Sequence, residues 1–209
     1  MKYVNFGCGL NVHDEFINFD SSPSLFIKRL PLIGFLLKNK MPQFPQLVKY
    51  GNISKGLPIE NESIDGIYSS HVIEHLSFDD SIKCFNNCYA YLKPNGIFRC
   101  VLPNFEALVN FYIEEKSIGN LNAANDFLTY SFLGKKGTSK SLFSFVKDYF
   151  SGANHLWMWD FESLSQELKK VGFKEIYKSQ FNNSIDKHFN KIEIESRYLF
   201  DALCIEAIK

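Results

Sequence analysis

The stretch Asp65-Gly66-Ile67-Tyr68-Ser69-Ser70-His71-Val72-Ile73-Glu74-His75-Leu76 decides the predicted fold. Its first six residues read as a buried strand that ends at Ser70. Three ionisable side chains, His71, Glu74 and His75, follow within five positions. His71 is therefore expected at the carboxyl end of a strand, the edge at which open α/β sheets bind ligands.

As a pattern alone, His71-x-x-Glu74-His75 matches the H-x-x-E-H signature of inverted zinc peptidases. In that signature a continuous helix presents two imidazoles to one metal. Here a predicted strand ends immediately before the pattern, which argues against such a helix. A zinc hydrolase using these three residues is a remote alternative.

Length and charge limit the class of protein. The chain has 209 residues, enough for a full α/β core and one insertion, so we expect a single domain over residues 1–209. Lysine plus arginine number 23 and aspartate plus glutamate number 23. This balance lacks the basic excess of nucleic-acid-binding proteins, and no nucleic-acid partner is expected.

The cysteine pattern favours a cytoplasmic protein with reduced thiols. The five cysteines form an odd set without a C-x-x-C pair, and the amino terminus lacks a charged start followed by an apolar run. Cys84 and Cys88 share one face of a predicted helix, and we interpret them as packing residues rather than metal ligands.

The apolar run over residues 25–37 is interrupted by charged residues, proline and glycine, and is too short to cross a bilayer. We interpret it as a lid or surface helix, with an interfacial membrane contact as the alternative. The surrounding residues 21–46 contain four prolines and are expected to form an irregular covering segment.

Strands and helices alternate along the chain. Strands are predicted at residues 3–6, 16–20, 47–50, 65–70, 97–102, 173–179 and 198–208, and the clearest helices follow Ser77 and Asp160. Lys93-Pro94-Asn95-Gly96 is predicted to be a turn. Two further helices, at 105–115 and 123–132, form an insertion of about 104–155 that we expect to enclose the substrate. This order predicts a largely parallel sheet with helices on both faces.

Several motifs resemble the class I S-adenosylmethionine-dependent methyltransferases, especially their small type 11 branch. They occur in the family's order as Asn5-Phe6-Gly7-Cys8-Gly9, Ile17-Asn18-Phe19-Asp20, Gly56-Leu57-Pro58, Ser63-Ile64-Asp65, Ser69 to Leu76, Leu92-Lys93-Pro94-Asn95-Gly96 and His155-Leu156-Trp157-Met158-Trp159-Asp160. The resemblance implies a Rossmann-like sheet of seven strands with the last strand antiparallel and a helical insertion after the fifth.

The resemblance also implies where S-adenosylmethionine, and its product S-adenosylhomocysteine, would bind. The cofactor would lie across the carboxyl ends of the first, second and fourth strands, with Asp20 accepting hydrogen bonds from the ribose hydroxyls. Many relatives carry aspartate where Asn52 stands, and its amide oxygen can still accept from adenine. The implied cofactor-binding residues are Asn5, Gly7, Cys8, Gly9, Asp20, Asn52, Ile53, Ser69 and Ser70.

Methyl transfer to a hydroxyl needs a positioned acceptor and a base, a task for which histidine is suited near neutral pH. The candidates are His71, His155 and His75, in that order, with a structural role favoured for His75. Glu74 resembles a position in ubiquinone-pathway O-methyltransferases, where a glutamate stands in place of His71 and the group is linked to a divalent metal. Since His71 replaces that carboxylate, no metal ligand is assigned, and assistance by a divalent metal is the lesser alternative.

The expected reaction is O-methylation of a small molecule or a glycan. The alternative from another class is a non-catalytic protein that binds S-adenosylmethionine or acts as a scaffold. Asn52 and the short loop between the first two strands favour this alternative.

Overall fold

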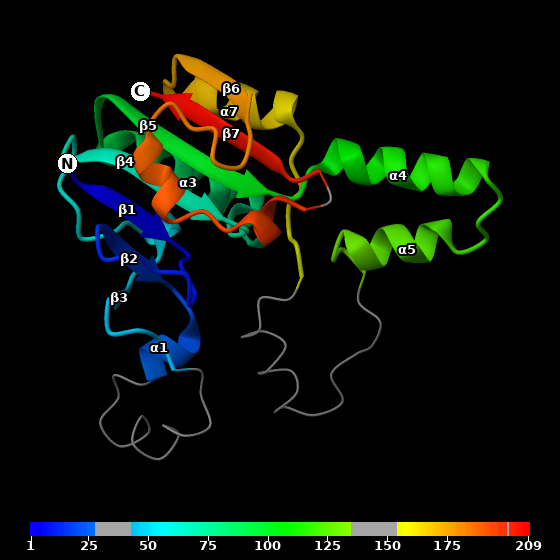
Figure 1. Cartoon of the computed structure of the whole chain (residues 1–209), viewed down its shortest axis with the longest axis horizontal. Coiled ribbons are helices and arrows are strands. Elements are labelled where there is room, and N and C mark those ends of the chain that lie inside the picture. The colour runs from blue at the N-terminus through cyan, green and yellow to red at the C-terminus, as the bar shows by residue number, and fades with distance from the viewer. Residues whose placement is uncertain (28–42, 135–153, 200) are drawn as a thin grey trace.

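A computed structural model of the chain describes residues 1–27, 43–134, 154–199 and 201–209. Its centre is one seven-stranded sheet in the order β3-β2-β1-β4-β5-β7-β6 (Figure 1). The strands are β1 (Tyr3–Phe6), β2 (Phe16–Asp20), β3 (Val48–Tyr50), β4 (Ile64–Ser70), β5 (Leu92–Leu102), β6 (Glu175–Ser179) and β7 (Leu203–Ile208). β7 pairs antiparallel with both β5 and β6, and the other pairs are parallel, as predicted.

The α-helices are α1 (Pro23–Ile27), α3 (Phe78–Tyr91), α4 (Phe105–Ser117), α5 (Ala123–Tyr130) and α7 (Phe161–Val171). Short 3₁₀ helices are η2 (Ile53–Lys55), η3 (Ile73–His75), η4 (Lys187–Lys191) and η5 (Glu195–Tyr198). Ser77 caps α3 by accepting from the backbone N–H of Asp80 at 3.2 Å, and Asp160 caps α7. Both caps agree with the sequence prediction.

β1 and β2 are parallel although only residues 7–15 join them, and this connection contains no helix. In place of the usual crossover helix there is a short loop, and two buried asparagines hold it by hydrogen bonds. Asn5 donates from Nδ2 to the carbonyl of Asn11 at 2.9 Å, and Asn18 donates from Nδ2 to the carbonyl of His13 at 2.9 Å. Because these amides satisfy the loop backbone from inside, the chain can return within a few residues.

The two faces of the sheet are covered differently. Phe85 of α3 and Leu164 of α7 belong to the main hydrophobic core on one face. On the other face, Phe189 and Ile192, from the connection between β6 and β7, pack against Tyr3. The predicted fold class is confirmed, and among the described residues the cover of this second face consists of short 3₁₀ helices.

Buried charges attach that connection to the sheet. Arg99 on β5 donates to Glu206 Oε1 at 2.7 Å and also contacts Glu193, and all three side chains are fully buried. A buried arginine between two carboxylates requires such complete pairing, because a lone buried charge is strongly unfavourable.

Two predicted boundaries differ from the structure by more than two residues. The strand predicted to begin at Tyr198 begins at Leu203, because residues up to Tyr198 form η5. The predicted turn at 93–96 falls inside β5, where the register shifts between the pairs Ile64–Leu92 and Gly66–Ile97. Asn95 has a φ of 65° there, so the chain does turn, but it does not leave the strand.

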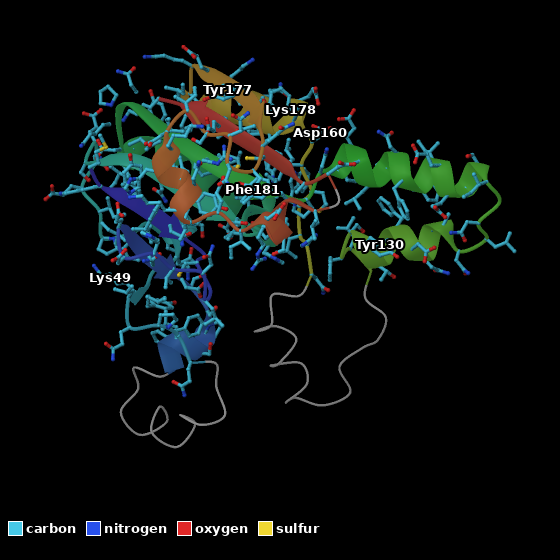
Figure 2. The ribbon with its side chains drawn as sticks, viewed as in Figure 1. Lys49, Tyr130, Asp160, Tyr177, Lys178 and Phe181 are labelled. Carbon is cyan, nitrogen blue, oxygen red and sulfur yellow. The ribbon has the colours of Figure 1, made fainter. Side chains whose placement is uncertain are left out.

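The predicted pair of helices in the insertion is confirmed as α4 and α5. They form a hairpin that extends away from the sheet, and Tyr130 lies at the end of α5 that points back toward it (Figures 1 and 2). The segment after α5 returns to the candidate site, where the rings of Phe132 and His155 lie 5.3 Å apart between centroids. Residues 135–153 of the insertion lie outside the described residues, so its enclosing role stays a prediction. Most of the predicted apolar run at 25–37 lies outside the described residues. None of the helices described here has the length and apolar character needed to span a membrane.

Candidate active site

The two glycines after β1 have different roles. Gly7 and Gly9 have φ angles of +64° and +53°, in the region that favours glycine. A Cβ on Gly7 would lie 2.2 Å from Cγ2 of Val72, so this position is filled by protein. A Cβ on Gly9 would meet nothing within 4 Å, so Gly9 borders open space at the carboxyl edge of the sheet.

Asp20 ends β2 directly beside this glycine loop. Its carboxylate is buried and accepts from the backbone N–H of Gly9 at 2.8 Å and from that of Ser22 at 2.7 Å. Each oxygen accepts one of these bonds and keeps a further lone pair for a hydroxyl donor. Burial, with a contribution from the Asp20 charge, raises the pKa of the Cys8 thiol to about 12.

Asn5, Asn52 and Ile53 have structural contacts that the sequence did not predict. Asn5 is buried and donates to the loop described above. Asn52 caps η2, where its Oδ1 accepts from the backbone N–H of Ser54 at 2.9 Å and from its hydroxyl at 2.8 Å. Ile53 is buried in the main core. The amide oxygen that was expected to accept from adenine is thus engaged in holding its own turn.

Ser69 and Ser70 form the carboxyl end of β4, as predicted. Ser69 is 1% exposed, and its hydroxyl has no hydrogen-bond partner in the described part of the chain. Ser70 is half-buried and closes the strand in register with Val101 of β5.

His71 follows β4 in a strained conformation, with a φ of +53°. Its Nδ1 lies 3.2 Å from Oε1 of Glu74, and its Nε2 lies 2.9 Å from the carbonyl oxygen of Arg197. A carbonyl only accepts, so Nε2 carries a proton in this arrangement. Burial lowers the pKa of His71, but the Glu74 carboxylate and the Arg197 carbonyl raise it by more, so the net direction is upward.

Glu74 lies at the centre of the three predicted histidines. It is fully buried, and its Oε1 is 3.9 Å from Nε2 of His155. The rings of His75 and His155 are 4.9 Å apart between centroids, and Nδ1 of His75 lies 3.2 Å from the carbonyl oxygen of Asn154. Burial lowers the pKa of His155. The structure therefore brings His155, from a distant part of the sequence, next to His71 and His75.

The backbone around this cluster does not have the zinc-peptidase form. His71 lies in a bend, and only residues 73–75 form a single 3₁₀ turn. Without a continuous helix through both histidines, the H-x-x-E-H interpretation is wrong. Cys84 and Cys88 are fully buried in the main core, as expected for packing residues.

Two contacts of the site were not predicted from the sequence. Val72 fills the space beside Gly7, and Arg197 reaches His71 through its backbone carbonyl. The sequence held a weak indication that Val72 belongs to the site, since it stands within the His-Glu-His stretch. The sequence held no indication of the Arg197 contact, because a residue of any type would offer a backbone carbonyl at that position.

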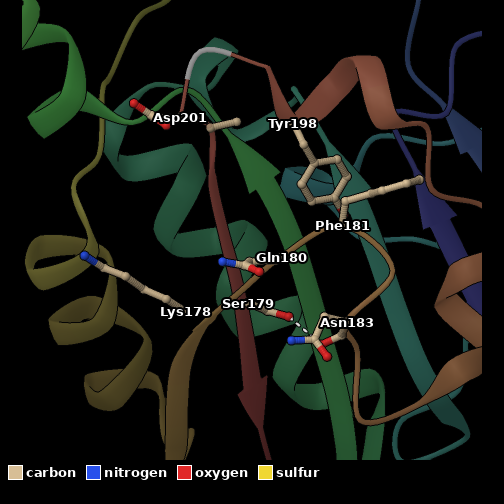
Figure 3. Close-up of a pocket in the computed structure, with 8 residues that line it drawn as sticks. Lys178, Ser179, Gln180, Phe181, Asn183, Tyr198 and Asp201 are labelled. Atoms are coloured by element: carbon tan, nitrogen blue, oxygen red, sulfur yellow. Dashed lines mark hydrogen bonds between the residues drawn. The ribbon is translucent and has the colours of Figure 1, made fainter.

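A separate pocket of about 550 Å³ opens at the same edge of the sheet, between the end of β6 and the start of β7 (Figure 3). Its lining is polar with two aromatic rings and consists of Lys178, Ser179, Gln180, Phe181, Asn183, Tyr198, Asp201 and Ala202. Tyr198 directly follows Arg197, so the pocket lies next to the segment that contacts His71. None of the predicted cofactor residues lines it.

Comparisons with known proteins relate this geometry to a fold family. A family model described as a methyltransferase domain matches residues 36–100. A SAM-dependent methyltransferase structure from Archaeoglobus fulgidus is 16% identical and aligns with 100% of this chain and 86% of its own, with a TM-score of 0.50. One from Mesorhizobium loti is 13% identical, covers 100% and 90%, and has a TM-score of 0.53. A search of curated proteins finds no match.

Proposed function

We propose that this chain, which has the fold of S-adenosylmethionine-dependent methyltransferases, binds that cofactor and transfers its methyl group to an oxygen of a small molecule or a glycan. The methyltransferase-domain match over residues 36–100 and the fold of the whole chain support the resemblance drawn from the motifs. The observation on which the proposal rests most is the pairing of Asp20 with Gly9.

That pairing combines the two features that a nucleoside cofactor requires. The buried Asp20 carboxylate offers free lone pairs to the ribose hydroxyls. Gly9 leaves space beside it where a side chain would otherwise stand. The carboxyl ends of β1, β2 and β4 meet at this edge, so the predicted residues Gly7, Cys8 and Ser70 border the same region.

The polar pocket beside β6 supports a hydroxylated acceptor. Gln180, Asn183 and Asp201 offer amide and carboxylate groups, and the rings of Phe181 and Tyr198 lie 5.3 Å apart between centroids. Such a mixture of polar groups and aromatic surface suits a sugar or a phenol. In this proposal the acceptor occupies that pocket and extends toward His71.

Calorimetric titration with S-adenosylhomocysteine tests cofactor binding, with one site per chain as the expected result. Asp20→Asn should weaken binding about tenfold or more, since it removes a charged acceptor from the ribose site. Asp65→Asn is the matched control, because Asp65 is also hydrogen-bonded but lies at the opposite end of β4. Absence of binding by the wild-type protein would contradict the proposal.

Cofactor binding without catalysis is the second candidate, because both ring nitrogens of His71 face oxygen atoms of the protein, Oε1 of Glu74 and the carbonyl of Arg197. Incubation with S-adenosylmethionine labelled in its methyl group, together with a pool of small molecules and glycans, distinguishes the two. Transfer of label to any acceptor excludes the binding-only alternative. Binding of S-adenosylhomocysteine with no transfer to any member of the pool favours it.

A further inference from the structure

Glu74, His75 and His155 bring one carboxylate and two imidazoles together. One ligand atom from each residue lies within 4.8 Å of the others, a spacing that a single ion can bridge. Glu74 is fully buried, and in the described part of the chain its Oε2 has no hydrogen-bond partner. A buried carboxylate oxygen without a partner is costly, so this atom points to a ligand.

One backbone contact orients the His75 side chain, and another positions the segment that carries His155. The Asn154 carbonyl accepts from Nδ1 of His75, which leaves the lone pair of its Nε2 free, as is usual for metal-binding histidines. The segment that carries His155 is attached to the Glu74 loop because the N–H of Leu156 donates to the carbonyl of Glu74 at 2.7 Å. The relative positions of the three residues are therefore determined by the fold.

His71 is excluded from this set by its own contacts. Its Nε2 faces the Arg197 carbonyl, and its Nδ1 faces Glu74, so neither nitrogen is directed to a shared ion. The cluster thus differs from the pattern His71-x-x-Glu74-His75, since its third member comes from residue 155.

We propose that Glu74, His75 and His155 bind one divalent transition-metal ion, with Zn²⁺ the best fit. Two imidazole nitrogens with one carboxylate form a ligand set typical of zinc and of related first-row metals. Mg²⁺ and Ca²⁺ prefer oxygen ligands alone and are disfavoured. The proposal does not require methyl transfer, so the two can be tested separately.

Titration of the full-length, metal-free protein with Co²⁺, followed by visible absorption, tests the site. We expect saturation at one ion per chain, bands that reflect nitrogen and oxygen ligands, and displacement of Co²⁺ by Zn²⁺. His75→Gln and His155→Gln should each weaken Co²⁺ binding about tenfold or more. A rise in melting temperature with Zn²⁺ in the wild type, absent from both variants, gives a second readout.

His13→Gln is the matched control. His13 belongs to a second group of possible ligands with Asp14 and Glu15, which lies largely at the surface, and its substitution should leave Co²⁺ binding unchanged. Circular dichroism shows whether each variant is folded, and His75→Gln is the more informative because His75 is only half-buried. The proposal is overturned if Co²⁺ does not saturate at one per chain, if folded His75→Gln binds as the wild type does, or if His13→Gln abolishes binding.

Discussion

The carboxylate of Asp20 accepts a hydrogen bond of 2.8 Å from the backbone N–H of Gly9, eleven residues earlier in the chain. This bond joins the end of β2 to the loop after β1. At the carboxyl edge of the sheet, this bond holds the anionic carboxylate of Asp20 beside Gly9, which has open space next to its Cα.

Gly9→Ala should weaken binding of S-adenosylhomocysteine about tenfold or more, because its methyl group would occupy the space beside Asp20. The positive φ of Gly9 adds a folding cost of about 1–2 kcal/mol. Gly119→Ala is the matched control, since Gly119 also has a positive φ and open space but joins α4 to α5. Calorimetry should show lost affinity only for Gly9→Ala, and equal affinity of the two variants would contradict the assignment.

Gly7→Ala should destabilise the protein by about 3 kcal/mol, because strain at positive φ adds to a clash with Val72. Adding Val72→Ala should recover about 1–2 kcal/mol of that loss, since it removes the clashing methyl groups. Urea denaturation of the two single variants and the double variant measures this coupling. Additive effects would show that Val72 does not limit the space at Gly7.

Asp160→Ala should lower the free energy of unfolding at pH 7 by about 1 kcal/mol, because it removes the cap of α7. Hydrogen bonds from the Ser163 hydroxyl and backbone hold the pKa of Asp160 below its ordinary value. The stabilisation is therefore complete above the unfolded-state pKa of about 3.9 and disappears as the pH falls through the lower folded-state pKa.

Urea denaturation between pH 7 and pH 2.5 should show the difference between wild type and Asp160→Ala shrinking toward zero at the acid end. Asp79→Ala is the control, since Asp79 lies exposed in the first turn of α3. Its effect should stay within about 0.5 kcal/mol. A constant difference across the pH range would mean that Asp160 acts through packing.

Thiol reagents should react with the five cysteines only after unfolding. All five are free and buried. Burial is the main cause that raises the pKa of both Cys8 and Cys204 to about 12, so about one thiol in ten thousand is ionised at pH 8. Less than one equivalent should react within minutes in the native protein, against five in guanidinium. Rapid reaction of Cys8 alone would indicate that the loop after β1 opens easily.

The approximate positions of the strands and the helix caps were predictable because they depend on local patterns. Ser77 and Asp160 precede apolar stripes at helical spacing, and the structure places both as caps. The start of β7 was not predictable in this way. Tyr198 has high strand propensity, but its hydroxyl contacts Glu193 within the buried charge network, and this tertiary contact keeps it in η5.

The membership of the histidine cluster was predictable, but its contacts were not. Chemistry and motif order pointed to His71, His75 and His155 individually. Their grouping around Glu74 depends on backbone bonds such as that from Leu156, and the Arg197 carbonyl would be present with any residue at 197. The resemblance assigned the amide oxygen of Asn52 to adenine. In the structure this oxygen caps η2 by accepting from the backbone N–H of Ser54.

The short connection between β1 and β2 also affects the order in which the sheet assembles. Tyr3 pairs with Phe16, thirteen residues away, and with Gly66, which is 63 residues away. Loop-closure entropy makes the nearer pairing less costly by about 1.4 kcal/mol, roughly tenfold in population. We therefore expect the amino-terminal strand pair to form first during folding and to serve as the template on which β4 later docks.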